Sequence, residues 1–237
     1  MRVSRLILAI IAALAIIAVV TLIWFFVSSG SGEASQPVTA PTLAVTTAAE
    51  TPPPTAETTA DATEAPTAEA TTVTAAPAGD PVVFSLVQGE SSISFELDED
   101  MRGQRLTVIG TSPDVAGQVG VNFADPSASE VGQIVFNLRT LNTGNDFRNR
   151  AIRGQILQSA RDEFEFGSFT PSVISGLPTT PIEDGQTVTF QITGDLTLRD
   201  VTNPVTFDVT LTEVSEERLV GQATATINRN DWGLTIP

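Results

Sequence analysis

VTFQITGDLTLRDVTNPVTFDVTL, residues 188–211, is the part of the sequence that decides the fold. Apolar residues occupy every second position from Val188 to Ile192 and again from Val205 to Leu211, with polar residues between them. This alternation is typical of antiparallel strands that bury one face and expose the other. Asp200 and Asn203 suit a tight connection between the two runs.

The same period of two recurs through residues 80–237, which we interpret as one folded domain. Six further runs lie at residues 93–97, 106–111, 119–123, 134–138, 164–170 and 219–227. Together they predict about eight strands, and therefore an all-β sandwich or closed barrel. Only Asp146–Gln158 has a helical pattern, with Asn145 and Asp146 as start signals. An eight-stranded barrel is just wide enough to be filled by side chains or to hold one small ligand, and the pattern favours neither.

The composition excludes several classes of function. The sequence has 28 acidic residues against 12 basic ones, all of them arginine, and it has no lysine, histidine, cysteine or tyrosine. A zinc site of the usual kind, a thiol nucleophile and an imidazole base are therefore absent, and we expect no enzyme. A net charge of −16 argues against binding to nucleic acid.

Residues 1–27 have the pattern of a transmembrane anchor. The 22 residues from Leu6 to Val27 are apolar except for Thr21, and as a helix they would be about 33 Å long, enough to span a bilayer. Arg2 and Arg5 precede this run, which predicts a cytoplasmic N-terminus. We expect a single-pass protein of the cell membrane with an extracytoplasmic C-terminal domain. The alternative is a cleaved signal peptide, whose apolar region is usually shorter.

Residues 28–79 consist mainly of Thr, Ala, Pro and Glu, without aromatic residues or arginine. Such a segment buries too little apolar surface to offset its ordering entropy, so we expect a disordered linker. As a flexible coil it would span about 40 Å.

Three stretches of the domain resemble the YceI-like family. They are LNTGNDFRNRAIRGQIL at residues 141–157, GDLTLRDVTNPV at 194–205, and INRNDWGL at 227–234. Asn149 stands where the family has Asp, and Trp232 where Phe is more usual. The resemblance covers residues 82–237 and implies an eight-stranded, lipocalin-like antiparallel barrel with one short helix and an apolar channel.

The family resemblance also implies a ligand. Members are associated with polyprenyl-type lipids outside the cytoplasm, so we expect an isoprenoid or other long-chain lipid, such as a quinone or polyprenyl phosphate, and no further cofactor. The family normally continues beyond the third stretch with another strand. This sequence ends at Pro237, so we expect that a C-terminal strand is missing and that an edge is left unpaired.

Two sets of residues are candidates for the binding site. The apolar set, expected to face inward, is Phe95, Val121, Phe136, Phe190, Phe207, Ala225 and Ile227. It would line a lipid channel or, alternatively, form a solid core. Arg148, Arg150 and Arg153 could bind an anionic lipid head, or simply form a solvated helix face with local ion pairs.

The acidic runs around Asp98 and Asp162 show no arrangement of oxygen ligands for a metal ion. The leading hypothesis is a lipid carrier, buffer or sensor, and the alternative is a cell-surface structural or interaction domain with a filled barrel. The sequence leaves open whether the domain forms a homodimer.

Overall fold

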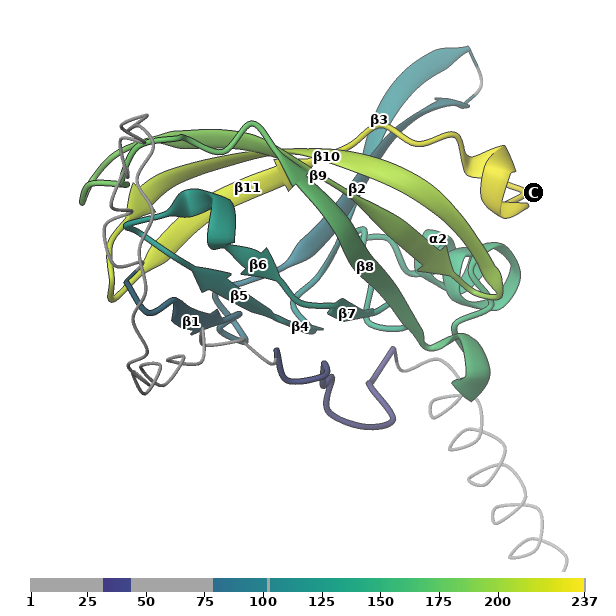
Figure 1. Cartoon of the computed structure of the whole chain (residues 1–237). Coiled ribbons are helices and arrows are strands. Elements are labelled where there is room, and N and C mark those ends of the chain that lie inside the picture. Colours follow the sequence, from purple (N-terminus) through teal and green to yellow (C-terminus); the bar gives the residue numbers. More distant parts are fainter. Residues whose placement is uncertain (1–31, 44–78, 102, 237) are drawn as a thin grey trace, which may run out of the picture.

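The computed structural model describes residues 32–43, 79–101 and 103–236 (Figure 1). The strands are β1 (Val82–Ser85), β2 (Ile93–Met101), β3 (Gln104–Ser112), β4 (Val115–Ala116), β5 (Gln118–Val121), β6 (Glu130–Val131), β7 (Ile134–Asn137), β8 (Phe166–Ser175), β9 (Val188–Leu198), β10 (Val201–Val214) and β11 (Leu219–Thr224). The helices are α2 (Asp146–Ala151), a π-helical turn η2 (Ile152–Ile156), and the 3-10 turns η1 (Pro126–Ala128), η3 (Asp162–Phe164) and η4 (Arg229–Trp232). The prediction of a mostly β domain with one short helix is confirmed.

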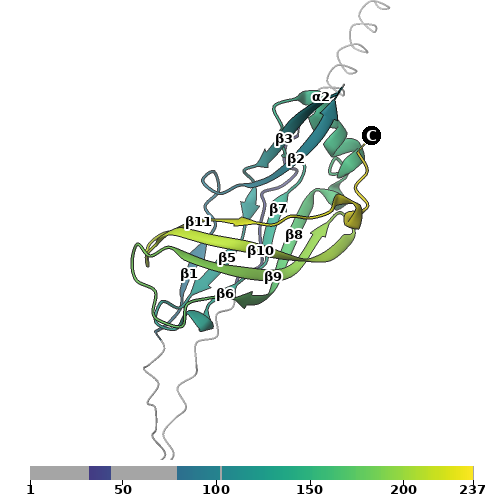
Figure 2. The same ribbon diagram turned by 90° about the horizontal axis from the view of Figure 1, so that it is seen from above.

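The strands form a curled, half-barrel sheet rather than a flat one (Figures 1 and 2). Six strands pair in the order β11-β10-β9-β8-β7-β4, three in the order β1-β5-β6, and β2 pairs with β3. The ladders between named strands are antiparallel. Each of the eight sequence runs corresponds to one strand, namely β2, β3, β5, β7, β8, β9, β10 and β11.

Glycines lie at two bends between short strands that follow each other closely in the sequence. Gly117 separates β4 from β5, and a side chain there would overlap Ile134. Gly132 lies between β6 and β7, and its backbone N–H donates to the Gln118 carbonyl at 2.9 Å. The chain therefore passes from the six-stranded sheet to the three-stranded sheet through two glycine bends, which gives the domain its curvature.

The eight-stranded closed barrel is not supported by these ladders. In the described part of the chain, β11 pairs only with β10, and the β2–β3 hairpin forms a ladder of its own. An isolated bridge between Thr111 and Asn142 links the hairpin to the body. The hairpin projects from the curled sheet in Figure 1 instead of joining β11. Alternation of apolar residues predicts the strands but not their partners, which is why the closure was predicted wrongly.

The apolar face of the curled sheet forms the core. In β9 the burial alternates, with Val188, Ile192, Leu196 and Leu198 buried and Thr189 exposed. The same face of β10 contributes Val205 and Val209, which lie opposite Gly194 and Phe190 of β9. The predicted period of two is thus the period of burial.

The helix is shorter than Asp146–Gln158. Asn145 caps α2, because its side chain accepts a hydrogen bond from the Arg148 backbone N–H at 3.1 Å. After Ala151 the backbone continues as the π-helical turn η2 and ends near Leu157. The predicted start signals are confirmed, while the second half of the predicted helix is a wider turn.

Residues 32–43 pack against the domain, which differs from the disordered linker expected over residues 28–79. Val38 is only 5% exposed. The Leu43 backbone N–H donates to the Gln118 side chain at 2.8 Å, and the Gln88 side chain donates to the Val38 carbonyl at 3.4 Å. We call residues 32–43 the strap (purple in Figure 1).

The predicted transmembrane anchor, residues 1–27, and linker residues 28–31 and 44–78 lie outside the described part of the chain. Among the helices of the described ranges, none is long and apolar enough to cross a bilayer.

Candidate functional site

The concave face of the half-barrel is a continuous apolar surface. Its main cluster of buried side chains includes Phe136, Phe169, Ile192 and Leu196, from three neighbouring strands. Phe169 and Phe207 contact each other edge to face, with ring centroids 4.9 Å apart. Glycines on this face make room for the rings: a side chain at Gly167 would overlap the ring of Phe136. Large aromatic side chains and small residues therefore alternate along the concave face.

Five of the seven apolar candidates belong to this surface. Phe136 is buried in the main cluster, and Phe95, Phe190, Phe207 and Ala225 are partly buried against it. The structure thus brings together residues from β2, β7, β9 and β10 and from the segment after β11.

The other two apolar candidates do not join them. Val121 is buried but belongs to neither hydrophobic cluster. Ile227 is 40% exposed and follows the end of β11, so it does not pack in the core, and its role in binding stays a prediction. Ile227 was included because it continues the alternation of the preceding strand. The strand ends at Thr224, however, so the alternation no longer determines where the Ile227 side chain points.

The three candidate arginines have different surroundings. Arg148 pairs with Glu99 of β2, with Nη2 and Oε1 3.1 Å apart. The Arg150 guanidinium lies 5.7 Å from the ring centroid of Phe147. Arg153 is partly buried and lies against Gly32 of the strap. Burial lowers the pKa of Arg153, while Asp146 raises it and Arg150 lowers it further. Arg148 and Arg153 are thus engaged within the domain, and Arg150 is the exposed member of the set.

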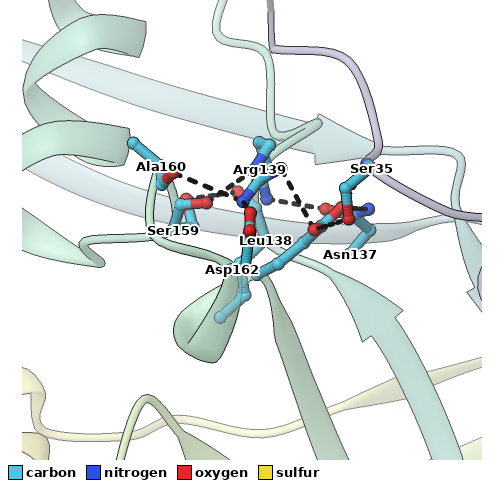
Figure 3. Close-up of polar contacts among 8 residues, drawn as sticks. Ser35, Asn137, Leu138, Arg139, Ser159, Ala160 and Asp162 are labelled. Atoms are coloured by element: carbon cyan, nitrogen blue, oxygen red, sulfur yellow. Dashed lines mark hydrogen bonds and ion pairs between the residues drawn. The ribbon is translucent and has the colours of Figure 1, made fainter.

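A buried polar cluster on the convex face is a feature that the sequence analysis did not identify (Figure 3). The Arg139 guanidinium bonds the Ser159 carbonyl at 2.7 Å and Asp162 at 2.8 Å, and its Nη1 lies 3.1 Å from Glu165. The Asn137 side chain donates to Glu165 at 2.8 Å. Asn137 and Glu165 are buried although both are polar.

The strap covers this cluster. The Ser35 backbone N–H donates to Glu165 Oε1 at 2.8 Å, and the Ser35 hydroxyl donates to Oε2. Burial would raise the pKa of Glu165, but the hydrogen bonds from Ser35 and Asn137 and the charge of Arg139 outweigh it and hold the pKa below its usual value. Glu165 is therefore an ionised, buried carboxylate that binds the strap.

The strap lies on the opposite face of the sheet from the phenylalanines. Gln118 and Asn137 have the opposite parity to the neighbouring residues Val119 and Phe136, so they point away from the concave face. The strap therefore does not occupy the concave face.

Two of the family-like stretches stabilise corners of the domain. The buried Asn149 side chain accepts from the Thr143 backbone N–H at 2.9 Å and from its hydroxyl at 2.8 Å. Trp232 is 2% exposed and its indole N–H donates to the Leu196 carbonyl at 3.1 Å. Both side chains therefore have a structural role in the domain.

A depression of about 310 Å³ lies on β8, β9 and β10, where mainly polar residues line it, such as Thr189, Gln191 and Asp208. It is open rather than enclosed, and Phe190 and Val209 are the only large apolar residues in its lining, so it offers little enclosed apolar surface to a lipid chain. Within residues 32–43, 79–101 and 103–236, no three acidic side chains gather as ligands for a metal ion.

A curled antiparallel sheet with an apolar concave face, aromatic side chains on that face and a short helix at one end defines an all-β protein of the half-barrel type. The chain belongs to the YceI-like family, whose domain model matches residues 84–237. This match agrees with the resemblance inferred from the three sequence stretches.

Curated relatives match part of the chain. The UPF0312 protein of Pseudomonas putida strain W619 is 30% identical over 133 residues, covering 54% of this chain and 64% of that protein. The UPF0312 protein of strain KT2440 is 29% identical with the same coverage. The chain therefore spans less than two thirds of the length of these relatives.

Two solved structures are similar to the chain. Burkholderia cenocepacia BcnA gives a TM-score of 0.47 at 17% identity, covering 62% of this chain and 83% of that chain. A polyisoprenoid-binding domain from Saccharophagus degradans, implicated in plant cell wall breakdown, gives 0.47 at 18% identity, with 65% and 82% covered. The assignment to the family rests on the match to residues 84–237.

Proposed function

We propose that the chain binds a long apolar lipid of the isoprenoid type along the concave face of its half-barrel. The observation that carries the proposal is the continuous apolar face built by Phe136, Phe169 and Phe207 in a member of the YceI-like family. A long hydrocarbon chain matches such a face because contact removes apolar surface of both from water.

The remaining parts of the proposal follow from the sequence. The apolar run at residues 6–27 would anchor the protein in the membrane, and the arginines before it would leave the domain outside the cytoplasm. The protein would act as a carrier, buffer or sensor rather than as an enzyme, because lysine, histidine, cysteine and tyrosine are absent.

Extraction tests the binding directly. The full chain is purified from membranes in mild detergent, extracted with organic solvent and analysed by mass spectrometry. An isoprenoid lipid in stoichiometric amount is expected, and it should be depleted in a sample of an unrelated anchored protein prepared in parallel. A chain that carries only bulk phospholipid, and that takes up no added polyprenyl phosphate, would contradict the proposal.

Ala225→Trp separates a ligand channel from a filled interior. Ala225 is a small residue packed against the main cluster beyond the end of β11. If the concave face holds a lipid, the indole occupies the space of the ligand, and binding is lost while the melting temperature is retained. In a filled interior the same change overpacks the core and costs typically about 1–3 kcal/mol.

The second candidate function is a structural or interaction domain with a filled interior. The observation in its favour is the depth of packing: Val115, Leu138, Leu141 and Trp232 of the main cluster are each at most 3% exposed. An unmodified protein that binds no lipid, together with an early-melting Ala225→Trp variant, would support this function instead.

A further inference from the structure

One end of the domain differs in charge from the rest. This helical end comprises residues 139–165, which contain α2, η2 and η3, together with the β9–β10 turn at 199–200 and residues 228–236, which contain η4. These segments lie at the same end of the half-barrel in Figure 1. They carry seven arginines and six acidic residues. With the β2–β3 hairpin (93–112), whose Glu99 pairs with Arg148 of α2, the numbers are nine and ten, whereas the remainder of residues 80–237 carries one arginine and twelve acidic residues.

The helical end also exposes an aromatic ring beside a cation. Phe147 of α2 is 82% exposed, and Val173, at 57%, is the next most exposed large apolar residue in the described ranges. The Arg150 guanidinium lies over its ring, and Arg150 forms no ion pair with another described residue. An aromatic ring with an adjacent arginine is a pair suited to the interface between lipid headgroups and hydrocarbon.

The strap brings the N-terminal part of the chain to this same end. Gly32 lies against the Arg153 side chain and the Arg139 carbonyl, both of the helical end, and Leu43 reaches β5 through Gln118. Only four residues, 28–31, separate Gly32 from the apolar run that ends at Val27. Five peptide steps span at most about 18 Å.

We propose that the helical end docks on an anionic lipid bilayer, with Phe147 entering the interface and Arg150 meeting the headgroups, while the strap holds the domain in this orientation. The proposal rests on the proposed membrane anchor. Charge supports it, because the near-neutral helical end can approach an anionic surface that repels the strongly acidic remainder of the domain.

Fluorescence in vesicles tests the orientation. The sequence has no cysteine, so a single cysteine can carry the probe. Gln155→Cys, exposed on η2, reports on the helical end and leaves Phe147 and Arg150 intact. Val87→Cys, 54% exposed, reports on the loop after β1, where Glu90 pairs with Arg218 of the β10–β11 turn, away from the helical end. The full chain is reconstituted into phosphatidylcholine vesicles with or without phosphatidylglycerol, and nitroxide lipids quench each probe.

Quenching at position 155 should exceed quenching at position 87 several-fold, and phosphatidylglycerol should increase it. Adding Arg150→Gln should weaken docking roughly fivefold, the factor for about 1 kcal/mol per arginine near an anionic surface. Adding Phe147→Ser should weaken it too. The matched changes Arg218→Gln in the β10–β11 turn and Val173→Ser on β8, both at exposed positions outside the helical end, should have no effect.

Equal quenching of the two probes, or quenching at position 155 that ignores phosphatidylglycerol, would overturn the proposed docking. So would a chain that fails to associate with the vesicles. Uptake of polyprenyl phosphate is measured on the same variants in detergent. If the chain takes up no polyprenyl phosphate but the probe at position 155 is still quenched preferentially, lipid binding by the concave face is contradicted and the docking proposal stands.

Discussion

Asn149 connects the loop before α2 to the helix itself. Its side-chain carbonyl accepts from the Thr143 backbone N–H and hydroxyl, and its amide donates to the Asn142 side chain at 3.1 Å. An aspartate, which is the usual residue of the family at this position, can accept the first two bonds but cannot donate the third. The departure from the family pattern therefore adds one hydrogen bond at a buried position.

Asn149→Leu should destabilise the domain, because it leaves the Thr143 N–H and hydroxyl without their acceptor in a partly buried loop. The expected loss is about 1–3 kcal/mol in the free energy of unfolding, measured by urea denaturation. Asn149→Asp should cost less, since it keeps both acceptor bonds. The control is Gln155→Leu at an exposed position of η2. A loss for Asn149→Leu no larger than that of the control would show that the loop does not depend on these bonds.

Glu165 makes the contact of the strap depend on pH. Its pKa is lowered in the folded protein, so its contribution to stability is present above the ordinary value of 4.5 and is lost as the pH falls through the lowered pKa. Protonation weakens the bonds from Ser35 and the attraction of Arg139. The strap should therefore loosen only in acid.

An NMR titration of the Ser35 amide measures this loosening. The resonance should stay constant from neutral pH down to 4.5 and move below that value as the bond to Glu165 is lost. In Glu165→Gln the same resonance should not titrate over this range. A resonance that already moves near neutral pH would mean that the pKa of Glu165 is raised, contrary to the balance described above.

Strands of the domain illustrate what the sequence could predict. The alternation in residues 188–198 and 205–211 identifies β9 and β10. In these strands one face points to the core and the other to solvent along most of the length, so the residue types alternate regularly. β1 has only four residues, VVFS, too few to show a period, and it was missed. The bends at Gly117 and Gly132 depend on contacts with Ile134 and Gln118 in the neighbouring strand, which no local pattern reveals.

Close packing between β7 and β8 gives a test at the scale of strands. Gly167 lies opposite Phe136, and a methyl group there would overlap the ring. Gly167→Ala should therefore displace the ring and cost about 1–3 kcal/mol in thermal or urea unfolding. Gly154→Ala is the matched control, because no atom lies within 4 Å of a methyl group at that position in η2. If both variants unfold alike, the concave face is less tightly packed than the contacts indicate.

The strap and the polar cluster below it escaped prediction for a physical reason. The strap is rich in small and polar residues, a composition that predicts disorder because such a segment buries little apolar surface of its own. Val38 is buried, and its carbonyl accepts a hydrogen bond from Gln88, 50 residues further along the chain, a contact that no local pattern reveals. Glu165 and Ser35 are 130 residues apart, so their bond is equally invisible to local patterns. The candidate site shows the same difference between local and long-range information. Alternation along the strands predicted five of its inner apolar residues, whereas the roles of Arg139 and Glu165 are visible only in the folded structure.

At the scale of the whole molecule, the strap links the proposed anchor to the orientation of the domain. The strap is held by one buried side chain, Val38, and by the hydrogen bonds of Ser35, Val38 and Leu43, so few contacts offset the entropy that its backbone loses on ordering. The contact therefore depends on the covalent connections at both ends of the strap.

Cutting the chain between the strap and the domain should therefore release the domain from the membrane. A specific protease site is inserted between Ala60 and Asp61, within residues 44–78, and protease is added to intact cells that display the full chain. The domain should appear in the supernatant because the strap alone holds it too weakly, and the fragment that begins after the cut should still fold and bind lipid, since the strap lies on the convex face. Before the cut, the probe at position 155 should report contact with the bilayer, and after the cut that signal should disappear.

A domain that stays on the cells after complete cleavage would mean that the strap, or the helical end itself, binds more strongly than its contacts account for. A domain that is never cut, while an external control protein is, would place it on the cytoplasmic side and remove the proposed orientation of the anchor.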